Sequence, residues 1–124
     1  MVGSRLSKPL DLDDIFKKIK IICKNNPKEE SCGLVSENGL HHLENVSEFK
    51  AFIYEINPVD YKKVRDEGVV SIFWHSHAIG GAIPSPMDTE YSLNSDLLCL
   101  IYSVKYECFS IFDPLSSDII YFSI

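Results

Sequence analysis

The stretch FWHSHAIGGAIPSPMD, residues 73–88, places His75, His77, Ser85 and Asp88 close together in the sequence. Imidazole nitrogens and carboxylate oxygens bind zinc. Two nitrogens and one oxygen would leave the fourth tetrahedral position of zinc open to water, as in catalytic sites. These residue types therefore suggest metal-assisted hydrolysis with one Zn²⁺ per chain.

The same stretch also has a purely structural interpretation. S-P-M-D, residues 85–88, is a capping box with a proline at the first helical position, and most such sequences only begin a helix. Two histidines on a strand are often half-exposed polar residues, and Gly80 and Gly81 can simply bend the loop. A strand end, a short glycine-bearing loop and a helix start together favour a metal site, but the spacing alone leaves both interpretations open.

Hydrolysis of this kind needs a base. A carboxylate near the metal can take a proton from water and return it to the leaving amine. Glu29 and Glu30 directly precede the strand-like residues 31–35, whereas most other acidic residues lie in polar helix or loop sequences. Position along the chain does not choose between Glu29 and Glu30.

The elements that must hold these residues follow from hydrophobic periodicity and turn signals. Apolar residues repeat with helical spacing after Asp11, a potential N-cap, and the helix ends at residues 25–27, Asn-Asn-Pro. Asn57 and Pro58 begin a second helix. The pattern predicts helices at 11–25, 57–68 and 86–94, and strands at 32–35, 40–46, 49–56, 69–77, 97–104, 106–112 and 118–124.

Strand 69–77 carries the two histidines. Because residues two apart on a strand point to the same face, His75 and His77 should project side by side, with Trp74 turned into the core on the other face. The whole pattern predicts an α+β fold with a mostly antiparallel sheet flanked by about three helices. Residues 1–10 are expected to be a flexible lead-in, and residues 11–124 a single domain.

Composition excludes several classes of protein. The chain is 45% hydrophobic and 24% charged, as in soluble globular proteins, and it has no apolar run of about 18 residues that would span a membrane. No signal peptide is evident, so we expect a cytoplasmic protein without a membrane partner. The net charge of -6 disfavours nucleic acid as a partner. The four cysteines lack metal-finger spacing and are expected to be buried free thiols.

Two motifs, taken together, resemble those of the JAMM, or MPN-plus, zinc metalloprotease family. The first is E-x-C-G-(L/V), found here at residues 30–34, and the second is H-S-H-x7-S-x-x-D, found at residues 75–88. The resemblance covers about residues 11–124 and implies the cytidine-deaminase-like fold of that family. The chain departs from the family at Ala78, where a proline that stiffens the loop is usual.

The resemblance assigns a role to each motif residue. It implies that His75, His77 and Asp88 bind zinc. It also implies that Glu30 is the general acid/base, that Ser85 helps to stabilise the oxyanion, and that the neighbouring glutamate is a bystander. The implied activity is hydrolysis of a peptide or isopeptide bond in a protein or peptide substrate.

Within the family, the likeness is strongest to the metalloprotease-like domain of phage tail-tip assembly proteins of the lambda K type. It lies in the segments NPKEESCGLV, INPVDYKKVRDEGVVSIFWHSH and LNSDLLCLIYSV. It implies processing of a phage tail protein, in a bacterial or phage-infected cell or associated with the virion. The alternatives are trimming of a ubiquitin-like or sulfur-carrier protein, and a non-catalytic scaffold that binds proteins.

Overall fold

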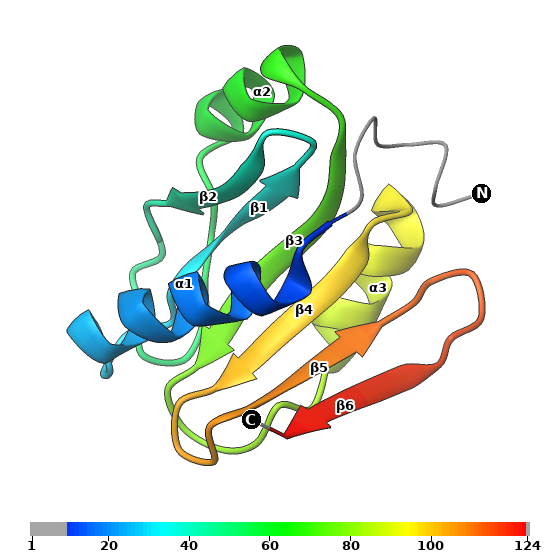
Figure 1. Ribbon diagram of the computed structural model, residues 1–124. Helices are drawn as coiled ribbons and strands as arrows, with labels where there is room; N and C mark the ends of the chain where they lie inside the picture. Colours follow the sequence, from blue (N-terminus) through cyan, green and yellow to red (C-terminus); the bar gives the residue numbers. More distant parts are fainter. Residues whose placement is uncertain (1–9, 124) are drawn as a thin grey trace.

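Six strands form a single sheet with helices on both of its faces (Figure 1). The structure is a computed structural model that describes residues 10–123. Its elements are α1 (Leu12–Asn25), β1 (Cys32–Ser36), β2 (Gly39–Leu43), α2 (Pro58–Glu67), β3 (Val70–His77), α3 (Pro86–Ser95), β4 (Leu98–Ser103), β5 (Cys108–Phe112) and β6 (Ile119–Ser123). The strand order is β2-β1-β3-β4-β5-β6, and only the pair β3–β4 is parallel. The prediction of an α+β fold with a mostly antiparallel sheet and three helices is confirmed.

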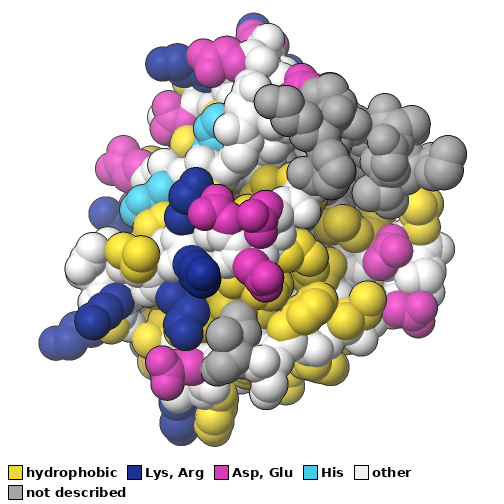
Figure 2. Space-filling model, in the orientation of Figure 1, with side chains coloured by type: hydrophobic (Ala, Val, Ile, Leu, Met, Phe, Trp, Pro, Cys, Tyr) yellow, Lys and Arg dark blue, Asp and Glu magenta, His cyan; other side chains and the backbone are white. Residues whose placement is uncertain are grey.

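Helix α1 lies across one face of the sheet (Figure 1). The Asp11 carboxylate accepts a hydrogen bond from the Asp14 backbone N–H, as expected of an N-cap. Charged side chains of both signs gather on the outer surface of this helix (Figure 2), and Lys18 pairs with Asp14 at 2.9 Å. The outer face of α1 is therefore solvated, which leaves its apolar stripe to face the sheet.

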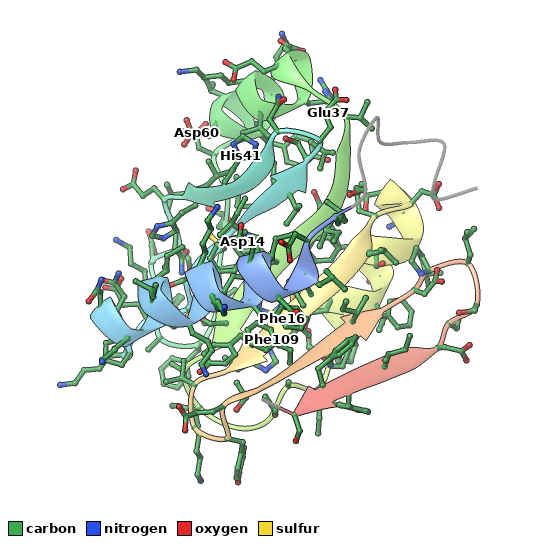
Figure 3. All side chains as sticks on the ribbon, viewed as in Figure 1. Asp14, Phe16, Glu37, His41, Asp60 and Phe109 are labelled. Atoms are coloured by element: carbon green, nitrogen blue, oxygen red, sulfur yellow. The ribbon has the colours of Figure 1, made fainter. Side chains whose placement is uncertain are left out.

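The inner face of α1 closes a dry core. Phe16 stacks on Phe109 of β5 with ring centroids 4.1 Å apart (Figure 3). Ile19 and Trp74 belong to the same cluster, and both are fully buried. The expected place of Trp74 in the core, on the side of β3 away from His75, is thus confirmed.

Helices α2 and α3 cover parts of the opposite face, where Val64 of α2 joins a second apolar cluster with Phe73 and Ile101. Helix α3 is the crossover that the parallel pair β3–β4 requires. The short loop between β3 and α3 consequently brings the first turn of α3 to the carboxyl end of β3. This crossover positions the candidate site.

The predicted strand at residues 49–56 is wrong. Residues 48–52 form turns, and in this part of the chain only an isolated bridge joins Asn45 to Ile56. Backbone N–H groups of Phe52 and Ile53 bond back to the Phe49 carbonyl, so no row of peptide groups is available to a neighbouring strand. Residues 52–56 instead line a pocket as a continuous run.

Three further predictions concerned residues 1–10, the four cysteines and the lack of a membrane span. The expected lead-in at residues 1–10 lies, apart from Leu10, outside the described residues. All four cysteines are free thiols, and only Cys108 is less than fully buried. No helix in residues 10–123 combines the length and the apolar character needed to cross a membrane.

Candidate metal centre

His75 and His77 lie at the carboxyl end of β3 and project to the same face, as the strand period predicts. Their ring centroids are 5.0 Å apart. The His75 side chain is only 2% exposed, whereas that of His77 is 16% exposed. The pair therefore has one deeply buried imidazole and one that faces the outside.

Asp88 reaches the histidines from the first turn of α3. Its Oδ1 atom lies 2.9 Å from Nε2 of His75, and its Oδ2 atom lies 3.9 Å from Nε2 of His77. Oδ2 also accepts the backbone N–H of Ser85, which closes the capping box. The cap and the cluster thus share one carboxylate, so the two interpretations of the sequence are compatible.

The three side chains could hold a metal ion. Each offers a ligand atom, and these atoms lie within 4.8 Å of one another. Nδ1 of His77 must be the protonated nitrogen, because it bonds to the Gly81 carbonyl oxygen at 2.8 Å. The lone pair of His77 Nε2 is therefore directed away from the loop, in the arrangement that outer hydrogen bonds give to metal-bound histidines.

The buried ring nitrogens of His75 indicate whether the cluster suits a metal ion. Neither of its buried ring nitrogens has a hydrogen-bond partner in the described structure, since the close approach of Asp88 does not follow a ring N–H direction. Buried polar atoms without partners are rare and costly. A metal ion held by His75, His77 and Asp88 would give one of them a partner, and two nitrogens with one oxygen suit zinc.

The electrostatics of the cluster favour a cation. Burial opposes protonation of His75, but the carboxylates of Asp88 and Glu30 and the Cys99 thiol raise its pKa well above the usual range. Burial likewise opposes ionisation of Asp88, but its contacts with His75 and Ser85 outweigh burial and lower the pKa of this carboxyl. The pair is therefore stable with a positive charge beside the carboxylate, and either a proton or a metal ion can supply it.

Glu30 lies beside this cluster, whereas Glu29 is exposed. The Glu30 side chain is buried, with Oε1 at 3.6 Å from Nδ1 of His75. Its neighbour Ser31 donates its backbone N–H to Oγ of Ser76, a residue between the two histidines but turned to the other face. The structure thus brings Glu30 into the site and leaves Glu29 outside it.

Ser85 is the N-cap of α3, and its Oγ accepts the backbone N–H of Asp88 at 3.2 Å. Because that bond uses only an oxygen lone pair, the hydroxyl hydrogen remains available as a donor. Ser85 lines the same pocket as the cluster and Glu30. All five sequence-predicted site residues consequently meet in one place.

The pocket above the cluster has a volume of about 1060 Å³. One wall consists of residues 52–56 together with α2, and the other consists of Met87 and Tyr91 of α3. Met87 is 71% exposed and Phe52 is 70% exposed. The entrance therefore presents apolar side chains together with exposed charged residues such as Glu55 and Lys62, while the buried His75 and Asp88 lie deeper.

Two residues of the site were missed in the sequence. Tyr54 stacks on His75 with ring centroids 4.4 Å apart, and Asn45 bonds through its side chain to the Glu30 carbonyl. Both residues belong to the region that the sequence pattern assigned to strands. An asparagine and a tyrosine in such a region carry no spacing signal, because their partners are distant in sequence.

No protein-family model and no curated protein matches the chain. The structure is similar to the solution structure of protein DSY2949 from Desulfitobacterium hafniense, with a TM-score of 0.64. The similarity covers 87% of this chain and 85% of that chain at 16% sequence identity. At this identity the likeness concerns the fold alone.

Proposed function

We propose that this protein is a zinc-dependent peptidase of the JAMM type, which hydrolyses a peptide or isopeptide bond. The observation that carries the proposal is the meeting of His75, His77 and Asp88 at the bottom of a pocket, with the buried Glu30 beside them. A site used only to cap α3 would need neither two buried ring nitrogens without partners nor a buried glutamate. The resemblance of the two motifs to the JAMM family agrees with this assignment.

His75, His77 and Asp88 would hold the metal. Zinc would supply Lewis-acid polarisation of the scissile carbonyl and would acidify water to a pKa of about 7. Glu30 takes a proton from the attacking water and returns it to the leaving amine. Its position suits that task, because the buried carboxylate lies beside the cluster, with Oε1 3.6 Å from Nδ1 of His75.

Ser85 would donate its hydroxyl hydrogen to the oxyanion that forms on the scissile carbonyl. The capping bond orients the serine side chain before substrate arrives, since Oγ is already fixed by the Asp88 backbone. The Ser85 side chain therefore loses its conformational entropy when the protein folds and not when substrate binds. The same bond ties the position of the donor to that of the metal-ligating aspartate.

The substrate class is a protein or peptide, and we propose a phage tail protein as the first to test. This choice rests on the likeness of three sequence segments to lambda K-type tail proteins. A ubiquitin-like or sulfur-carrier protein would use the same chemistry. A non-catalytic scaffold is the competing function, and it predicts that the protein binds partners without turnover.

Zinc content is the first measurement. Elemental mass spectrometry of purified protein is expected to find about one zinc per chain in the parent and almost none in Asp88→Ala. Circular dichroism of both proteins would show that α3 still forms without its cap carboxylate. A parent that binds no zinc, even after incubation with zinc, would overturn the peptidase proposal and favour the scaffold.

Adjacent glutamates give a matched pair for the base. Glu30→Gln is expected to bind zinc normally but to lose about 10²–10⁴-fold in kcat, the usual contribution of a general acid/base. Glu29→Gln removes the same charge at an exposed neighbour and is expected to match the parent. Cleavage of a proteome-derived peptide library, scored by mass spectrometry, provides the assay. Equal losses in both variants would refute the assignment of Glu30.

A further inference from the structure

One wall of the pocket is a closed loop, residues 45–56, which we call the wall segment. Its ends meet in the bridge between Asn45 and Ile56, and the Val46 backbone N–H bonds to the Glu55 carbonyl at 2.8 Å. The segment contributes no ligand or base. It contacts both Glu30, the proposed base, and His75, a proposed metal ligand.

Asn45 fastens the wall segment to Glu30. Its buried amide nitrogen donates to the carbonyls of Glu30 at 2.8 Å and of Ile53 at 3.0 Å. Its amide oxygen accepts the backbone N–H groups of Ser47 and Glu55, each at 3.0 Å. Both donors and both lone pairs of the side chain are thus used. A single amide holds the fold of the segment and its distance from Glu30.

A second bond reinforces that attachment. The Glu30 backbone N–H donates to the Lys50 carbonyl at 2.6 Å. Both backbone polar groups of Glu30 are therefore bonded to the wall segment, and its side chain is left to face His75. Movement of the segment would move Glu30 with it.

Tyr54 connects the same segment to the metal-ligand cluster. Its ring lies on that of His75 with centroids 4.4 Å apart and an angle of 22° between the planes. The stack covers one face of the imidazole, and rotation of the His75 ring would require displacement of Tyr54.

We propose that Asn45 and Tyr54 are positioning residues that work in series. Asn45 fixes the wall segment against Glu30, and the segment in turn fixes the Tyr54 ring on His75. The wall segment, which supplies neither a metal ligand nor the base, thereby sets the position of Glu30 relative to His75. This inference rests on the proposed function, because it gives the wall segment a role only if His75 binds zinc.

Zinc affinity, measured by competition with a chromophoric chelator, tests the role of Tyr54 without any substrate. Tyr54→Ala is expected to weaken zinc binding about tenfold, at the low end of the 10–100-fold effects of outer-shell partners. Tyr54→Phe keeps the stack and is expected to bind zinc as the parent does. Phe49→Ala makes a comparable truncation in the same segment at a residue that is 61% exposed, and it should have no effect. Tyr54→Leu serves the comparison if the alanine variant does not fold.

Asn45→Asp tests the connection, because it removes both amide donors with little change of shape. Hydrogen exchange of Glu30 and the wall segment is expected to accelerate, and zinc binding to weaken severalfold. In a Tyr54→Ala background the same change should weaken zinc binding no further, since residues that act in series are not additive. Asn38→Asp, which removes an amide donor to the Glu67 carbonyl at an exposed site, is the matched control.

The outcomes separate this inference from the proposed function. Absence of zinc binding in the parent would overturn both. Parent affinity in Tyr54→Ala, failure of Tyr54→Phe to match the parent, or additive losses in the double variant would each overturn the inference alone. The d–d absorption spectrum of cobalt-substituted protein provides a second measure, and it should change in Tyr54→Ala but not in Phe49→Ala.

Discussion

Asp88 uses its two carboxylate oxygens for different purposes. Oδ2 closes the capping box with Ser85, and Oδ1 faces His75. The N-terminal end of a helix favours a negative charge, so α3 stabilises the ionised form that a metal would require. A residue at the third position of the helix can therefore cap it and still present an oxygen to the strand beside it.

Ser85 allows its two tasks to be measured separately. Ser85→Ala is expected to lower the free energy of unfolding by about 1 kcal/mol through loss of the cap, whereas Ser85→Gly should cost only a few tenths. Both variants lack the hydroxyl and should lose about 10²–10³-fold in kcat, as when an oxyanion donor is removed. Urea unfolding and peptide cleavage measure the two quantities. A glycine variant with parent activity would exclude Ser85 as a donor.

Individual residues also mark the limit of what the sequence reveals. Glu29 and Glu30 are chemically identical neighbours, and bonds to residues distant in sequence, such as Lys50 and Asn45, hold Glu30 in its buried position. The histidines and Asp88 were predictable because strand and helix periods place them together. Tyr54 was not, since its contact with His75 depends on the path of an irregular loop.

At the scale of elements, β1 shows why a glycine follows the cysteine of the first motif. Gly33 lies between its partners His42 on β2 and Trp74 on β3. The Trp74 indole N–H donates to the His41 carbonyl at 3.1 Å, directly over the glycine. A Cβ atom at Gly33 would overlap that carbonyl oxygen and would lie 2.6 Å from the indole nitrogen.

Gly33→Ala is therefore expected to destabilise the protein by about 3 kcal/mol or more, at or above the upper end of ordinary overpacking costs. The bond between Trp74 and His41 would be lost with it. Gly81→Ala adds the same methyl group where its nearest neighbours are 3.8 Å away, and it should be nearly neutral. Thermal unfolding of the two variants gives the comparison. A stable Gly33→Ala protein would show that β1 and β2 can separate at little cost.

The elements with local stop and start signals were those the sequence predicted well. Caps at Asp11, Asn57 and Ser85 begin the three helices, and Glu37 and Asn38 form the turn between β1 and β2. The strand order was not predictable, because pairing depends on contacts between distant segments. The strand predicted at residues 49–56 was wrong for the same reason. The Asn45 side chain bonds to the Ile53 carbonyl and to the Glu55 backbone N–H, and this partner was not evident from the local sequence.

At the scale of the whole molecule, the sheet separates two environments. The α1 face is a closed apolar core, whereas the face with α2 and α3 contains the pocket and the cluster. The false strand did not affect the prediction of His75, His77 and Asp88, because these three residues depend on β3 and α3 alone. The site was consequently easier to predict than the full topology.

Buried weak acids in both environments predict how stability depends on pH. Burial raises the pKa of Cys32 to about 12, and it also raises the pKa values of Cys23 and Cys99. Above about pH 9 the unfolded chain loses these protons before the folded protein does, so the free energy of unfolding should fall as pH rises. Urea unfolding of zinc-free protein between pH 7 and 10.5 would test this. Constant stability over that range would contradict it.

The crossover between β3 and α3 also has a consequence for the order of events during folding. Its short loop brings His77 and Asp88 together at a small entropic cost, and loops of about ten residues close in roughly 10–100 ns. Glu30 joins only when β1 pairs with β3, which requires closure of a much longer stretch of chain. If the site binds zinc as proposed, a partly folded chain could hold the metal at the end of β3 and the start of α3 before Glu30 joins the site, and that form would lack the proposed base.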